Sequence, residues 1–167
     1  MGRLAQTFAG LQIMDMFPYN MPTEQTFTTG QTGIAFPNAD LMNQEGMPFA
    51  VHRVIPRVSA LDSSGLLLAT QPDVNVAEAL IKLAVLWQGF NQNGTKAPTR
   101  ISNLVGGSTS ERYWRLEEPI VLPNANGVVL TGSCDTFPAS FAGSGIISLR
   151  VTLVLQGFFL QVAPPRG

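Results

Sequence analysis

The sequence has few of the residues that build reactive or metal-binding sites. Its 167 residues include one cysteine, Cys134, and one histidine, His52. A single cysteine excludes an intrachain disulfide and leaves no cysteine pair for a metal ion. A metal site of the cupin type needs several histidines, so we expect His52 to be an ordinary strand residue. We expect Cys134 to be a small buried side chain at the end of a strand, and we expect no metal ion and no cofactor.

Charged residues are also scarce. They make up 13% of the chain, about half the usual share, while apolar residues make up 45% and the net charge is −1. This balance supplies no basic patch, so we expect no direct nucleic-acid binding. No apolar run is long enough to span a membrane. A surface with so little charge is poorly protected against association, so we expect much of it to be buried against other subunits.

Recognisable catalytic and targeting motifs are missing as well. The apolar residues after Arg3 are interrupted by Gln6 and Thr7, so we expect synthesis without a secretory route. No G-x-S-x-G elbow is present. Glu117 and Glu118 are neighbours, which places them on opposite faces of a strand and excludes a carboxylate pair flanking one bond. We therefore expect the protein not to be an enzyme.

The clearest structural signal is the segment 145–162, GIISLRVTLVLQGFFLQV. Apolar and mostly polar residues alternate from 147 to 156, which is typical of a strand with one buried face. The expected buried set is Ile147, Leu149, Val151, Leu153 and Leu155. After Gly157 both alternating positions become apolar, so we expect a bulge or bend at Gly157 and cover on both sides. The pattern predicts a central strand.

Shorter signals precede this strand at a spacing typical of sandwiches. Residues 49–58 read as a strand in which Pro56 is restricted to an edge, a bulge or a bend. A turn at 61–65 leads to a short return strand over 66–69. The segments 111–122 and 128–131 are expected strands joined by an Asn-Gly hairpin within 124–127.

The segment 76–90 satisfies two patterns at once. Asn75 followed by Glu78 is typical of a helix start, whereas the alternation of residues 81–87 favours a strand. Asn93-Gly94 then favours a hairpin turn. We expect a strand over residues 80–90 that follows about one helical turn.

The first 48 residues differ in composition from the remaining chain. All 6 methionines and half of the 10 phenylalanines lie at or before Phe49. We interpret residues 1–48 as an extended N-terminal arm and residues 49–167 as a β-sandwich domain. The arm either folds back over its own domain or docks on a neighbouring subunit through its soft or large apolar side chains.

Helical spacing at the start of the arm predicts a short amphipathic helix. Leu4, Phe8 and Leu11 share the expected face, and Pro18 must end the helix. Beyond it we expect an extended chain with short strand pieces.

One cluster of side chains has the chemistry for ligand recognition. Tyr113 and Trp114 can stack on sugars, and Arg112 and Arg115 supply hydrogen-bond donors. Strand alternation places one of the two aromatic rings toward the core. The alternative function is therefore a carbohydrate- or receptor-binding module of a tail or surface appendage, with Tyr113 and Trp114 near its site.

With these strands the chain resembles the single jelly-roll virion proteins of bacteriophages. The resemblance lies in the Met- and Phe-bearing arm, the strand FAVHRVIP, the low-charge body and the closing LRVTLVLQGFFLQVAPP. It implies an antiparallel β-sandwich of jelly-roll type that serves as a capsid or head-decoration subunit. It also implies a homo-oligomer, a trimer or larger, that contacts other shell proteins and is found in the virion after synthesis in the host cytoplasm.

The residues expected to make subunit contacts all lie in the arm. Arg3 is the expected polar anchor, and the apolar contacts are Leu4, Phe8, Leu11, Met14, Met16, Phe17 and Tyr19.

Overall fold

The computed structural model describes residues 6–8, 11–89, 93–106 and 112–162. The strands are β1 (Gln6–Phe8), β2 (Leu11–Thr28), β3 (Ile34–Ala35), β4 (Phe49–Leu61), β5 (Ile81–Gln88), β6 (Asn93–Arg100), β7 (Trp114–Leu122), β8 (Val128–Cys134) and β9 (Ser148–Val162). The helices are the 3-10 turn η1 (Asn38–Leu41), α1 (Val74–Leu80), α2 (Ile101–Leu104) and α3 (Ala139–Gly143). None of the helices in these ranges is long and apolar enough to cross a membrane.

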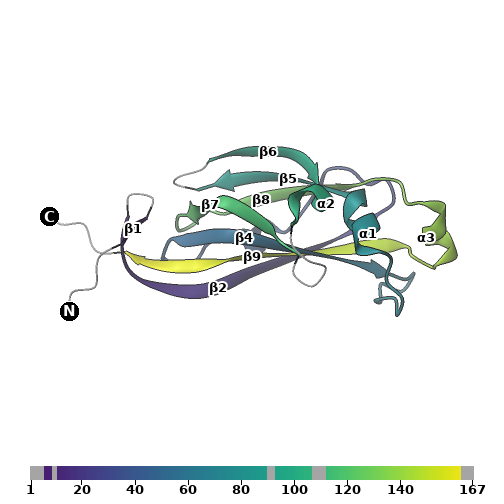
Figure 1. The fold of residues 1–167 in the computed structure, drawn as a ribbon, viewed down its shortest axis with the longest axis horizontal. Coiled ribbons are helices and arrows are strands. Elements are labelled where there is room, and N and C mark those ends of the chain that lie inside the picture. Colours follow the sequence, from purple (N-terminus) through teal and green to yellow (C-terminus); the bar gives the residue numbers. More distant parts are fainter. Residues whose placement is uncertain (1–5, 9–10, 90–92, 107–111, 163–167) are drawn as a thin grey trace.

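The strands form two antiparallel sheets (Figure 1). The larger sheet has the order β1-β2-β9-β4-β7 and the smaller one the order β3-β8-β5-β6. Within the described ranges, only β1–β2 and β5–β6 are neighbours both in sequence and in a sheet. The structure confirms the predicted antiparallel β-sandwich.

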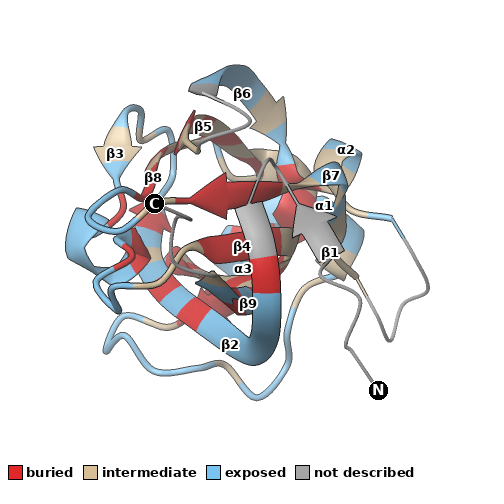
Figure 2. Cartoon of the chain, turned by 90° about the vertical axis from the view of Figure 1, so that its left-hand side faces the viewer, coloured by how far each residue is buried: buried red, intermediate tan, exposed pale blue. Residues whose placement is uncertain are grey.

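The closing strand β9 lies between β2 and β4, which confirms the predicted central strand. Leu149, Val151, Leu153 and Leu155 are at most 1% exposed and belong to the main core. Figure 2 shows the buried positions gathered between the sheets. Ile147 is 52% exposed, so its predicted burial is wrong. It precedes β9, and its amide donates to the Leu61 carbonyl.

The irregularity expected at Gly157 lies in the partner strand instead. The pairing of β4 with β9 shifts between Val51 and Arg53, which makes His52 the extra residue of a β-bulge. Gly157 stays in register with β4. A glycine is required there because the backbone of Ala50 comes so close that a Cβ at residue 157 would lie 2.1 Å from the Ala50 carbonyl oxygen.

The prediction that both faces of β9 are covered beyond Gly157 is met only in part, because Phe158 is 36% exposed. Phe159 packs in the main core. Leu160 packs in a separate cluster with Ile13, Ala50 and Val121. Because neighbouring strand residues point to opposite faces, this second cluster lies on the other side of the sheet.

Residues 11–28 of the expected arm form a strand of the sandwich itself. β2 pairs with β9 from Ile13 to Thr28, and Met21 and Phe27 are buried in the main core. This is the fold-back alternative for that segment. The predicted amphipathic helix is wrong, because the described part of its range belongs to β1 and β2. The long pairing with β9 outweighs the local helical spacing.

The ambiguous segment 76–90 contains both predicted elements, with different ends. The helix α1 is capped by Asp73, whose Oδ1 accepts from the amides of Asn75 and Val76 at 2.8 and 3.3 Å, so the predicted start at Asn75 is wrong. The strand β5 follows directly. Asn93 and Gly94 pair with β5 as the first residues of β6 and do not form the turn.

Two other connections differ from those that the sequence predicts. Residues 66–69 contribute only an isolated bridge between Leu67 and Leu61, so no return strand forms there. The turn at 124–127 joins β7 to β8, which belong to different sheets, so it is not a hairpin. In the turn at 124–127 the residue with a positive φ is Ala125. Pro56 lies in β4 beyond Val54, where the described part of β7 no longer pairs with it, which agrees with its predicted edge position.

Candidate functional site

The N-terminal half of β2 exposes a run of large apolar side chains, which we call the β2 surface. Met14, Met16, Phe17 and Tyr19 are 54%, 49%, 45% and 44% exposed. Figure 2 shows this stretch as the exposed bend of β2. Large apolar residues that are neighbours and exposed mark interaction sites more often than scattered ones do.

The side chains of the β2 surface project from both faces of the strand. Phe17 pairs with Phe159, and Met16 pairs with Leu160 on the opposite face. The Tyr19 ring lies 4.8 Å from the Phe159 ring and packs edge-on against Phe49. These ring contacts fix Tyr19 from one side and leave its other side open. The surface is therefore a rigid strand with apolar side chains, and needs little ordering before it can bind a partner.

The structure brings together only part of the predicted contact set. Met14, Met16, Phe17 and Tyr19 are adjacent on β2. Phe8 and Leu11 are paired at the backbone of the β1–β2 hairpin. Arg3 and Leu4 lie outside the described residues.

A second group of residues surrounds the bulge at His52. The His52 ring stacks on Phe158, with centroids 5.4 Å apart and 22° between the planes. Its Nδ1 is buried and has no hydrogen-bond partner among the described residues. Arg53 donates from Nε to the Gln156 side chain and places its guanidinium 5.2 Å from the centre of the Tyr113 ring. Sequence alternation could not find this group, because a bulge breaks the two-residue period.

Tyr113 and Trp114 lie in different surroundings. Trp114 packs against Trp87, with ring centroids 6.0 Å apart, and Lys96 covers it at 5.2 Å. This confirms that one of the two rings faces the core. The structure therefore does not combine Tyr113 and Trp114 into one stacking platform.

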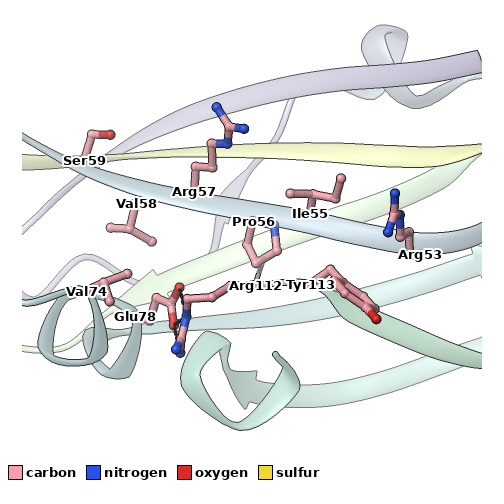
Figure 3. Close-up of a pocket in the computed structure, with 10 residues that line it drawn as sticks. All are labelled: Arg53, Ile55, Pro56, Arg57, Val58, Ser59, Val74, Glu78, Arg112 and Tyr113. Atoms are coloured by element: carbon pink, nitrogen blue, oxygen red, sulfur yellow. Dashed lines mark hydrogen bonds and ion pairs between the residues drawn. The ribbon is translucent and has the colours of Figure 1, made fainter. Parts of the chain in front are cut away.

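Tyr113 also lines an open groove of about 450 Å³ beside β4 (Figure 3). Arg53 and Arg57 project from β4 at one side of it, while Glu78 of α1 and Arg112 meet at the other. Arg112 donates from Nε and Nη2 to both carboxylate oxygens of Glu78, at 2.6 to 3.1 Å. These hydrogen bonds raise the pKa of Arg112. Glu78 is 1% exposed and the Arg112 side chain is partly exposed, so the ion pair that links α1 to the chain entering β7 has a buried carboxylate.

No reactive centre is evident among the side chains that the structure describes. No group of three or more His, Cys, Asp or Glu residues in these ranges is placed to hold a metal ion. Cys134 is buried at the end of β8, as predicted. Burial, with a smaller effect from Asp135, raises the pKa of its thiol to about 11, which keeps it in the unreactive protonated form.

Protonation of His52 is expected to destabilise the fold. Burial, and secondly the Arg53 charge, lower the pKa of His52 in the folded chain below its usual 6.5. The unfolded chain therefore binds a proton more readily, and the free energy of unfolding falls as the pH drops from about 6.5 toward the lower folded pKa. Urea unfolding at pH 7.5 and pH 5.5 should show a larger loss for the wild type than for His52→Gln. Equal losses in the two proteins would contradict this expectation.

Comparisons of the chain with protein-family models, with curated proteins and with solved structures found no match. Its function must therefore be inferred from the fold and from the surface that the fold presents.

Proposed function

We propose that the chain is a structural subunit of a virus particle, either a capsid protein or a capsid-decoration protein, without catalytic activity. It assembles with copies of itself as a trimer or larger, and with other shell proteins. The observation that carries this proposal is the β2 surface, where large apolar side chains stand exposed on a strand that pairs with β9 from Ile13 to Thr28, with a bulge at Met14.

The strand order supports a jelly-roll fold. One sheet contains β2-β9-β4-β7 and the other β3-β8-β5-β6, so each sheet combines early strands with late ones. Two Greek keys wrapped into a double sheet produce such an order, and this fold is common in viral capsid and lectin domains. Because a fold does not define a function, the proposal depends mainly on the surface.

The composition and the surface favour assembly for the same physical reason. Removing one large apolar side chain from water contributes about 1.5–3 kcal/mol, so a few such residues on each subunit can hold a contact together. A chain with only 13% charged residues has little to oppose that contact. Closed symmetry then buries the same residues on every copy.

Substituting the β2 surface with serine is expected to dissociate the assembly. In the double variant Met16→Ser/Phe17→Ser, the two contacts are lost while the strand keeps its pairing with β9. Light scattering over a range of concentrations should show trimers or larger assemblies for the wild type and monomers for the variant. Thermal unfolding should show that the variant is folded.

The matched control is Leu66→Ser/Leu67→Ser. These leucines are 65% and 60% exposed but lie beside Leu61, at the far end of β4 from the pairing of Phe49 with Phe159. The control should assemble like the wild type. A monomeric wild type, or equal dissociation of both variants, would overturn the proposal.

The second candidate is a carbohydrate- or receptor-binding module, and it is supported by Tyr113 at the groove of Figure 3. Arg53 lies against one face of that ring and can donate hydrogen bonds to a bound sugar. Trp114 contributes less, because it packs against Trp87. Glycan binding that is lost in Tyr113→Ala, with the fold intact, would favour this candidate over the shell subunit.

A further inference from the structure

We propose that the free edge of β2 disfavours pairing with an additional strand. A second copy of the chain then contacts β2 through side chains and not through backbone hydrogen bonds. The inference deepens the proposed function, because it specifies which kind of contact the β2 surface can make. It depends on the backbone groups along the edge rather than on the exposure of the apolar residues.

The edge in question is long and open. β2 pairs with β9 on one side from Ile13 to Thr28. On its other side, the described part of β1 pairs only with residues 11–13. Unpaired edges of this length attract further strands and lead to aggregation unless the sequence prevents it.

The even-numbered residues of β2 direct their backbone groups toward the open edge. Amides of successive strand residues point to alternate sides, and a proline inside a strand must place its nitrogen away from the ladder. Pro18 and Pro22 are paired with Phe158 and Val154 of β9, so the side of the even residues is the open one. These two positions offer no N–H to an incoming strand.

Side chains of the chain itself occupy further donors on this edge. The Met16 amide donates to Asp15 Oδ1 at 2.9 Å, and the Thr26 amide donates to Gln25 Oε1 at 2.8 Å. Gln25 is held in place, because its Nε2 donates to the Ala35 carbonyl of β3 at 2.8 Å. At the end of the strand, the Thr28 amide donates to the side chain of Gln31 at 2.8 Å.

Between residues 16 and 28 the edge therefore keeps only the amides of Asn20 and Glu24, with Pro22 between them. An antiparallel partner needs a donor at every second residue to form a continuous ladder. Opposite Pro18 and Pro22 its carbonyl groups would be buried without donors. The edge thus disfavours strand pairing, while the Met and Phe side chains remain free to dock on the side chains of a second copy.

Restoring the missing donors tests the inference. Pro18→Thr/Pro22→Thr supplies two amides and adds no apolar side chain. At about 1 kcal/mol for each restored hydrogen bond, edge pairing should strengthen roughly 30-fold. We expect thioflavin T fluorescence to appear, and light scattering to rise above that of the wild-type assembly, at concentrations where the wild type gives no thioflavin signal.

The control Pro72→Thr removes a proline from a loop before α1, with a similar gain in chain flexibility and no new edge donor. It should behave like the wild type. A folded double variant with unchanged thioflavin signal and unchanged size would overturn the inference.

A variant that keeps both prolines covers the case in which the double variant fails to fold. Gln25→Ala frees the Thr26 amide and should shift association in the same direction by a smaller factor. An unchanged association of this variant would also count against the inference. A monomeric wild type would contradict the proposed assembly, but the proline variant would still report on the edge.

Discussion

Replacing Gly157 by alanine is expected to destabilise the sandwich by about 3 kcal/mol or more, the upper range for overpacking a core. Gly157 pairs with Tyr19 on one side and Val51 on the other, so it lies at the centre of the larger sheet. An added Cβ would lie 2.1 Å from the carbonyl oxygen of Ala50 and 2.8 Å from its carbonyl carbon. The obstacle is backbone held by two ladders, so it cannot rotate away.

Equilibrium unfolding in urea measures this effect, and Gly143→Ala is its matched control. No atom lies within 4 Å of a Cβ placed at Gly143, which ends α3. Alanine is a better helix residue than glycine, so the control should lose no stability. A Gly157→Ala protein as stable as the control would show that β4 moves aside easily.

Replacing Arg112 by alanine is expected to cost about 3–5 kcal/mol, because it leaves a buried carboxylate without its partner. Glu78 is 1% exposed, and Arg112 supplies the hydrogen bonds described for both its oxygens. The loss is a large part of the roughly 5–15 kcal/mol that stabilises a typical domain. Unfolding in urea at neutral pH measures it.

Two further variants separate the cost of an unpaired charge from the value of the pair. Arg112→Met/Glu78→Met removes both charges and should recover most of the stability, because a buried ion pair can be replaced by apolar residues of similar volume. Arg112→Lys keeps the charge but loses the bidentate geometry, and should lie between the wild type and Arg112→Ala. If the double methionine variant were as unstable as Arg112→Ala, packing rather than charge would explain the loss.

The sequence predicts those strands whose burial follows a simple alternation. β9 is recognisable because Leu149 to Leu155 are buried at every second position. β2 is not, because residues 14–20 are exposed on both faces and two prolines interrupt it. Its strand conformation depends on pairing with β9, which lies more than a hundred residues later in the chain. Local patterns contain no information on such a partner.

The sequence likewise predicts some features of the candidate site and not others. Met14, Met16, Phe17 and Tyr19 are exposed, and the subunit contacts expected of them stay a prediction. The bulge at His52 and the pairing of Glu78 with Arg112 required the fold, because they join residues whose spacing matches no local motif. Asp15 and Gln25 became interpretable only when their acceptor atoms were seen beside the amides of β2.

The central position of β9 has a consequence for the synthesis of the protein. β9 follows every other described strand in sequence, yet it separates β2 from β4 in the larger sheet. On the ribosome, β2 and β4 cannot be joined until β9 has emerged, so the larger sheet closes only after nearly the whole chain has been made. A chain that stops before Ser148 leaves its β2 and β4 edges and apolar faces open to chaperones and proteases. We therefore expect chains truncated before Ser148 to be degraded rather than to complete the larger sheet.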